Sequence, residues 1–129
     1  EWEYACRAGT VTARYYGETD TLLDRYAWYA NNSRTQLMLP IGSLKPNDLG
    51  LFDMLGNVFE WPQEAMSNHE PGDDLEDQRV VTNKLNRALR GGSFFYLSLV
   101  VRSAYRIGYQ PSFQSFNFGF RVARTRNEP

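Results

Sequence analysis

GLFDMLGNVFEW, residues 50–61, is the stretch that decides how this chain folds. Glycine, aspartate and asparagine are interleaved here with large apolar side chains, and neither helical nor strand periodicity is sustained. Such a composition is typical of an ordered loop that is packed by its own side chains, rather than of a helix or a linker. The same character begins at Ile41, so we expect residues 41–61 to form one long ordered loop.

Regular structure is expected in a few short segments around this loop. EWEYACRAG, residues 1–9, has a short helical pattern that closes on a glycine, and YAWYANNS, residues 26–33, predicts an aromatic-rich strand or turn. The last third is strand-like, with arginines among apolar residues in ALRGGSF (88–94), VRSAYRI (101–107) and FGFRVAR (118–124). One helix and three short strands separated by irregular loops predict an α+β fold rather than a parallel α/β sheet.

Composition limits the kinds of partner. The chain has 129 residues, of which 15% are aromatic, and a formal net charge of -1. One domain with a real core is expected, and the charge balance gives no reason to expect nucleic acid or an anionic membrane as partner. No apolar run reaches membrane-spanning length, and among compartments the cytoplasm is slightly favoured. Cys6 is the sole cysteine, which excludes an internal disulfide, and its place in the helix predicts a small core residue.

An acidic segment, SNHEPGDDLEDQ, occupies residues 67–78. Its charge, Pro71 and lack of periodicity predict a solvated loop, followed by a short edge segment at residues 80–83. His69, the only histidine, is expected to be a solvated loop residue rather than a metal ligand.

In this order the blocks resemble the signature of the formylglycine-generating enzyme (sulfatase-modifying factor) family: EWEYACRAGT, YAWYANNS, GLFDMLGNVFEW, LRGGS, RSAYR and GFRVAR. The resemblance implies a C-type-lectin-like fold with long ordered loops. It also implies that residues 1–129 are the C-terminal portion of such a domain, completed by an N-terminal segment or a companion chain. The same domain type occurs in sulfoxide synthases of ergothioneine synthesis, in kinase-linked modules and in variable proteins of diversity-generating retroelements.

The resemblance also implies where catalysis would take place. In formylglycine-generating enzymes two cysteines follow the GGS block and bind copper(I) as thiolates. The matching positions here are Tyr96 and Val101. We therefore expect neither copper binding nor formylglycine formation. Non-haem iron needs two histidines and usually a carboxylate, which this chain cannot supply by itself.

A calcium site is implied at Asp53, Gly56, Val58 and Glu60, through two carboxylates and two backbone carbonyls. The alternative is that Asp53 caps a turn and Glu60 pairs with an arginine. A second family calcium site would begin at Asn31 and Asn32.

Three arginines in the strand-like blocks, Arg102, Arg106 and Arg121, are expected to brace the long loops by binding backbone carbonyls and carboxylates such as Glu60. Recognition of an anionic substrate by one of them is the alternative.

Residues 94–101, FFYLSLVV, are almost entirely apolar. Either alternate members are core residues of a strand, or the outward members belong to a binding face for a protein or a small ligand. The predicted face comprises Phe95, Tyr96, Leu97, Tyr105, Ile107, Tyr109, Phe113 and Phe116.

Three functions follow: a non-catalytic binding module, a diversified receptor, or an oxidoreductase whose metal ligands are supplied elsewhere. The receptor hypothesis rests on the residue types between GGS and GFR. From Phe95 to Asn117 only Gln110 and Gln114 fall outside the set that adenine-directed mutagenesis reaches.

Overall fold

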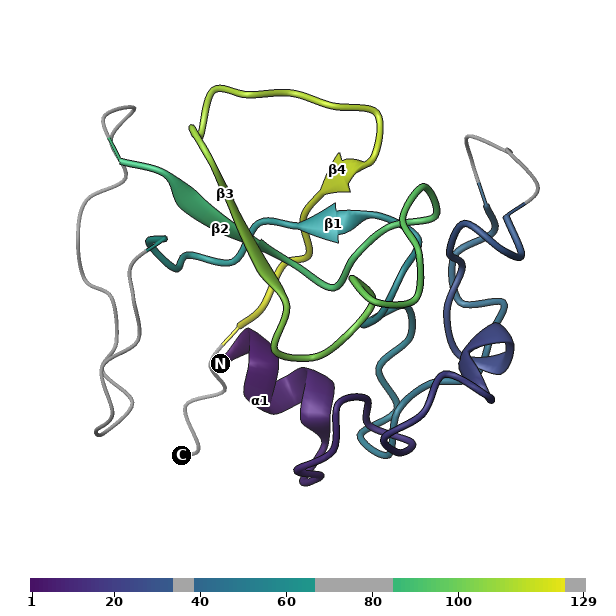
Figure 1. Cartoon of the computed structure of the whole chain (residues 1–129). Coiled ribbons are helices and arrows are strands. Elements are labelled where there is room, and N and C mark those ends of the chain that lie inside the picture. Colours follow the sequence, from purple (N-terminus) through teal and green to yellow (C-terminus); the bar gives the residue numbers. More distant parts are fainter. Residues whose placement is uncertain (34–38, 67–84, 125–129) are drawn as a thin grey trace.

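The computed structural model describes residues 1–33, 39–66 and 85–124. The acidic segment, His69 and the predicted edge segment at 80–83 lie outside these residues. Helices are α1 (Trp2–Arg7) and a single 3-10 turn, η1 (Leu23–Arg25). The strands are β1 (Phe59–Glu60), β2 (Arg87–Arg90), β3 (Arg106–Tyr109) and β4 (Phe118–Gly119), and long loops connect them (Figure 1).

Helix α1 confirms the helical pattern at the start of the sequence. It ends where Ala8 and Gly9 adopt left-handed backbone angles, with φ of 49° and 88°. The Ala8 N–H donates to the Tyr4 carbonyl at 3.1 Å, which satisfies one of the last helical carbonyls. Cys6 faces the core and is fully buried, as predicted.

The four strands form one sheet in the order β3-β2-β1-β4. β2 pairs antiparallel with both β1 and β3, whereas β1 and β4 run parallel. Glu60 lies opposite Arg90 on one side and Gly119 on the other. The sheet therefore brings the GNVFEW, LRGGS and GFR blocks side by side, although they are far apart in sequence.

Some strands begin or end at other residues than the sequence predicted. β1 lies at the end of the segment that was expected to be wholly loop, and β3 begins at Arg106 rather than at Val101. Residues 26–33 contain turns and no strand, which is the second of the two predicted alternatives. The α+β class is confirmed.

The core is formed largely by loops, and at some points their backbones approach so closely that only glycine fits between them. The core cluster is built from all over the chain: Cys6, Tyr15, Leu23, Ala27, Tyr29, Met54, Leu55 and Val101. A Cβ at Gly56, whose φ is 75°, would come within 2.3 Å of the Trp28 carbonyl oxygen. Only glycine fits this position, which explains why residues 50–61 are an ordered loop and not a linker. Among the described residues, no helix is long and apolar enough to cross a membrane.

Candidate binding face and loop junction

Glu60 is the centre of a buried junction between the loops. It accepts hydrogen bonds from Arg121 Nε at 2.7 Å and Nη2 at 2.6 Å, and from the Trp2 indole N–H at 2.8 Å. Arg121 Nη2 also donates to the carbonyls of Phe52 and Asp53, both at 3.1 Å. The junction thus ties α1, β1, the loop before it and the C-terminal segment together, which confirms that Arg121 braces the loops.

Asp53 takes part in the same junction. Its φ of 53° is left-handed, and its Oδ2 accepts a hydrogen bond from the Gly42 N–H at 2.7 Å. Its Oδ1 is buried and has no hydrogen-bond partner among the described residues. Asp53 therefore ties its own turn to the backbone at Gly42, eleven residues earlier in the chain, rather than capping a local turn.

Of the two carboxylates implied for calcium, Glu60 is engaged by Arg121 and Trp2, whereas Asp53 keeps one oxygen without a hydrogen-bond partner among the described residues. Calcium needs free carboxylate oxygens, but both oxygens of Glu60 already accept hydrogen bonds. The positively charged guanidinium of Arg121 also lies next to Glu60, where it would repel a bound cation. Gly56 and Val58 belong to the same tightly packed loop. The described part of the chain holds no cluster of three or more His, Cys, Asp or Glu side chains suited to a metal. Asn32, expected near a second site, instead binds the Tyr29 N–H and the Ala27 carbonyl. Calcium binding stays an untested implication of the family resemblance, whereas the pairing of Glu60 with Arg121 predicts a junction that needs no metal ion.

The other predicted arginines behave differently from each other. Arg106 pairs with Glu64 at 2.8 Å and donates to the Ala65 carbonyl at 3.4 Å, so it braces a loop as expected. Arg102 shows no such contact in residues 1–33, 39–66 and 85–124, where its buried Nε has no hydrogen-bond partner.

Arg90 and Arg14 are among the arginines whose bracing roles the sequence did not predict. Arg90 is buried and joins Glu3 of α1 to Glu64, both at 2.8 Å. Arg14 is also buried and donates to the carbonyls of Ser98 at 2.8 Å and Val101 at 3.1 Å. Arg14 therefore holds the end of the apolar segment in place. Its position in a loosely alternating segment gave no signal of contacts so distant in sequence.

The apolar segment 94–101 forms turns and not a strand, which corrects the strand hypothesis. Burial alternates nevertheless. Phe94 and Val101 are 2% and 0% exposed, whereas Phe95, Leu97 and Leu99 are 65%, 62% and 71% exposed. Hydrogen bonds to Asn57 and Ala30 fix the backbone, since the Phe94 N–H donates to the Asn57 carbonyl and the Tyr96 carbonyl accepts from the Ala30 N–H. Three large apolar side chains are thus held outward by a rigid backbone.

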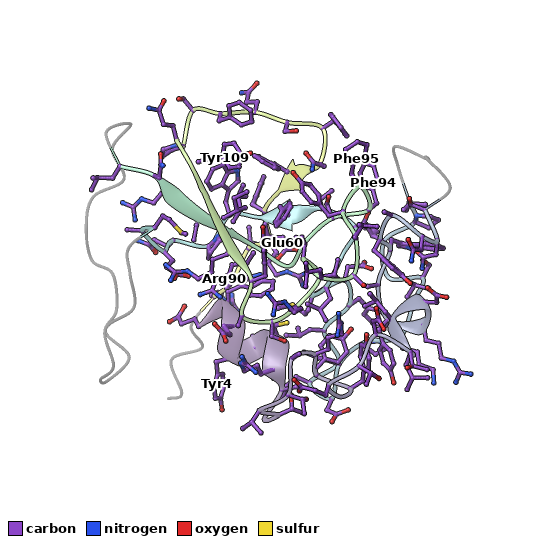
Figure 2. All side chains as sticks on the ribbon, in the orientation of Figure 1. Tyr4, Glu60, Arg90, Phe94, Phe95 and Tyr109 are labelled. Carbon is purple, nitrogen blue, oxygen red and sulfur yellow. The ribbon has the colours of Figure 1, made fainter. Side chains whose placement is uncertain are left out.

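Of these side chains, Phe95 belongs to a continuous network of aromatic rings. Centroid distances of 4.9–6.3 Å link the rings of Phe59, Trp61, Phe94, Phe95, Tyr96, Tyr105, Tyr109, Phe113, Phe116 and Phe118. Buried Phe59 contacts Tyr96 edge-on at 5.2 Å, and Tyr109 stacks on Phe113 at 4.9 Å. Figure 2 shows Phe94, Phe95 and Tyr109 at one end of the molecule and Tyr4 at the other.

The predicted face residues divide into two groups. Phe95, Leu97, Phe113 and Phe116 are exposed, by 48% or more, and we refer to these four as the outer group. The inner group is half-buried and comprises Tyr96, Tyr105, Ile107 and Tyr109. The pKa of Tyr96 is raised, first by burial and then by the nearby hydroxyls of Tyr109 and Tyr105. Tyr96, Tyr105 and Tyr109 are only partly exposed, because Phe59 and Phe118 pack against them. Their part in binding stays a prediction.

The positions that align with the copper-binding cysteines are occupied by packing residues. Val101 is fully buried, with its Cγ2 only 2.9 Å from where a Cβ on Gly92 would lie. Cys6, the one thiol, is buried elsewhere against Ser103 Oγ at 3.5 Å. Burial raises the pKa of Cys6 to about 11, so it is a protonated structural thiol.

This arrangement defines an α+β domain of the C-type-lectin-like type, poor in regular structure and held together by long ordered loops. The family model of the Sulfatase-modifying factor enzyme 1-like domain matches residues 1–126, and the chain belongs to that family.

Four relatives illustrate the range of proteins with this domain. Serine/threonine-protein kinase pkn1 of Chlamydia pneumoniae is 31% identical, over 98% of this chain and 20% of its own length. The formylglycine-generating enzyme of Streptomyces coelicolor is 32% identical, over 95% of this chain and 44% of its own. Treponema denticola variable protein 1 superposes with a TM-score of 0.81 and 30% identity, over 93% of this chain and 43% of that one. PvdO from Pseudomonas aeruginosa superposes with a TM-score of 0.74 and 25% identity, over 93% and 48%. The chain thus spans less than half the length of each of these proteins.

Proposed function

We propose that the chain is a binding module without formylglycine-generating activity, and that its binding face is the outer group of Phe95, Leu97, Phe113 and Phe116. The observation that carries this proposal is their exposure on a base of interlocked rings. Soluble proteins rarely expose contiguous apolar surface without a partner for it.

The face has the physical properties of a recognition surface. Phenylalanine and tyrosine provide large contact areas at a low cost in side-chain entropy, because each has only two side-chain torsions. Tyr96 packs against Phe95, and Tyr109 stacks on Phe113, so these two tyrosines restrict the motion of the outer rings that they contact. Such preorganisation favours affinity, because little conformational freedom remains to be lost on binding.

Peptide selection tests this proposal. A phage-displayed peptide library is selected on the wild-type protein, and the enriched clones are measured on two variants. Phe95→Ser removes a side chain of the face that is 65% exposed, whereas Tyr4→Ser removes one on α1 that is 78% exposed. We expect the clones to lose most binding to Phe95→Ser and to retain it on Tyr4→Ser, with both variants folded. If the clones bind Phe95→Ser as well as they bind Tyr4→Ser, the outer group is not the binding face.

A second candidate function is a diversified receptor, in which the face varies between copies of the gene. It is supported by the fold shared with Treponema denticola variable protein 1 and by the exposure of residues between the GGS and GFR blocks. A template repeat and a reverse transcriptase gene beside the coding sequence would support it. Their absence from the genomic neighbourhood would leave an invariant binding module.

A competing explanation of the exposed apolar residues is a companion segment or chain. The structural neighbours contain about as much chain again as the matched part. Hydrogen exchange on a longer form of the protein distinguishes the two proposals. Protection of residues 95–99 that appears only in the longer form would show that the face is an internal contact. An oxidoreductase with ligands on that companion is tested by metal analysis of the purified complex.

A further inference from the structure

The two segments that carry the exposed apolar side chains contain no charged residue. Neither residues 91–101 nor residues 107–119 include an Asp, Glu, Lys or Arg. These four types make up 22% of the whole chain, so their absence from two segments of this length is not expected from composition. The same segments carry the outer group, 48–65% exposed, and Leu99, 71% exposed. Charge and apolar exposure are therefore separated along the chain.

The polar side chains of these segments are also neutral. They belong to serine, asparagine, glutamine and tyrosine. Gln110, Ser112 and Gln114 are exposed in the loop between β3 and β4, which is at the top of Figure 1. Hydroxyl and amide groups form neutral hydrogen bonds, and they lose far less than an ion does when water is removed. The face thus offers apolar contacts and neutral hydrogen bonds.

The arginines of the neighbouring strands are neutralised inside the domain. The Arg90 side chain in β2 is 4% exposed and pairs with Glu3 and Glu64, both at 2.8 Å. The Arg106 side chain in β3 is 11% exposed and pairs with Glu64 at 2.8 Å. Figure 2 shows Arg90 near α1, away from the end of the molecule that carries Phe95. These two cations therefore contribute little charge to the aromatic end.

Charged residues occur at the border of the face. Asp20 is exposed, and its carboxylate accepts a hydrogen bond from the Ser98 hydroxyl at 2.7 Å. Arg102 directly follows the first uncharged segment and is half-buried. Protein interfaces commonly have this arrangement, in which charged residues are depleted from the core of the contact and are found in its polar rim.

We propose that the partner of this face is another protein whose contacting surface is itself uncharged and apolar. The inference rests on the proposed function and adds the chemistry of the partner. A charged group of the partner would lose its water on contact and would find no countercharge in residues 91–101 or 107–119. The same reasoning disfavours nucleic acid, whose affinity comes largely from contacts with its phosphates.

A protein fits this face better than a small molecule does. Small-molecule sites are concave and enclose most of the ligand surface. The outer group and Leu99 instead present 48–71% of their own surface to solvent. Side chains exposed to this extent are suited to enter depressions on a larger partner, which then excludes water from both apolar surfaces.

The peptide clones selected on the wild-type protein test this chemistry. We expect clones that depend on Phe95 to contain fewer Asp, Glu, Lys and Arg residues than the unselected library. Synthetic peptides of these clones are titrated in about 0.01 M and about 1 M salt, where the Debye length is about 30 Å and about 3 Å. Their Kd should change by less than about threefold, because no opposite charges attract each other across the contact.

Adding a charge of either sign to the face gives a matched test. Gln114→Glu and Gln114→Lys change an exposed neutral side chain between Phe113 and Phe116, and both should weaken the same peptides about tenfold. Val11→Glu and Val11→Lys place the same charges in the turn after α1, at a side chain that is 94% exposed, and should have no effect. All four changes lie on the surface, so the variants should stay folded.

Several results would overturn this inference. The first is a set of clones that depend on Phe95 but are charged, with a Kd that changes by more than about threefold with salt. The second is a Gln114 variant that binds more tightly than wild type, or two Gln114 variants that bind like it. The third is self-association in sedimentation velocity that Phe95→Ser abolishes, because a second copy would then cover the face. A library without any clone that depends on Phe95 removes the proposed function itself.

Discussion

Replacing Glu60 with glutamine should show that an arginine, and not a metal ion, holds the loop junction together. The change keeps the shape of the side chain and removes the charge that Arg121 contacts through two nitrogens, at 2.6 Å and 2.7 Å. Removing one member of a buried ion pair costs about 3–5 kcal/mol. The Arg121 side chain is 32% exposed, so water screens part of the loss, and we expect about 2–3 kcal/mol.

Urea denaturation of a double-mutant cycle measures this interaction. The cycle compares wild type, Glu60→Gln, Arg121→Met and the double variant, all in chelator. We expect a coupling free energy above about 1 kcal/mol, because the two side chains are in direct contact. Glu18→Gln changes an exposed carboxylate that accepts only a local bond from the Ala13 N–H, and it should stay within about half a kcal/mol of wild type.

Repeating the cycle with excess calcium tests the calcium prediction in the same samples. A bound ion would stabilise the wild type in proportion to the logarithm of its excess, and Glu60→Gln would lose that gain. Because Arg121 and Trp2 already use both oxygens of Glu60, we expect identical curves in calcium and chelator. Coupling near zero in chelator, together with a calcium-dependent gain in wild type, would refute the reasoning and restore the calcium site.

Three other results are expected. Incubation with a sulfatase-type cysteine peptide, copper(I) and oxygen should leave the peptide mass unchanged, because Tyr96 and Val101 stand where thiolates are needed; a protein-dependent loss of the thiol would contradict this. Burial opposes ionisation of Glu3, but the hydrogen bond from Arg7 and the charge of Arg90 leave the pKa of Glu3 lowered. The ionised Glu3 therefore contributes fully to stability above the unfolded-state pKa, and this contribution is lost as the pH falls through the folded-state pKa. Glu3→Gln should therefore flatten the acid limb of the stability curve, and an unchanged limb would count against the ion pairs. Tyr96→Ala should cost about 2 kcal/mol in urea denaturation, between core and surface values, and more than Phe95→Ala; equal costs would contradict the division into inner and outer groups.

Sequence predicted best where local chemistry decides the structure. The glycines and turn-forming residues of 50–61 give an ordered loop because Gly56 must pass close to Trp28, and α1 ends just before the expected glycine, with Ala8 as its cap residue. The pairing of Glu60 with an arginine was also predictable, since buried carboxylates need a partner.

Contacts between residues far apart in the sequence could not be predicted from the sequence. β1 exists only because β2 and β4 pair with it, so nothing local distinguishes Phe59 and Glu60 from the loop around them. Alternate burial in residues 94–101 mimics a strand, although hydrogen bonds to Asn57 and Ala30 fold the segment into turns.

The central proposal is that the side chains of the outer group bind a partner, while the rest of the domain keeps their backbone positions fixed. Randomising Phe95, Leu97, Phe113 and Phe116 in a yeast-display library tests it most directly. We predict that most members remain folded, since exposed substitutions cost within about half a kcal/mol each, and that different members bind different protein targets. A library at the buried positions Phe59, Leu89, Phe94 and Val101 should be largely unfolded, because truncating a large core side chain costs about 2–5 kcal/mol. If the outer-group library is equally unfolded, or if its folded members show no difference in binding, the account of this chain as a binding module is wrong.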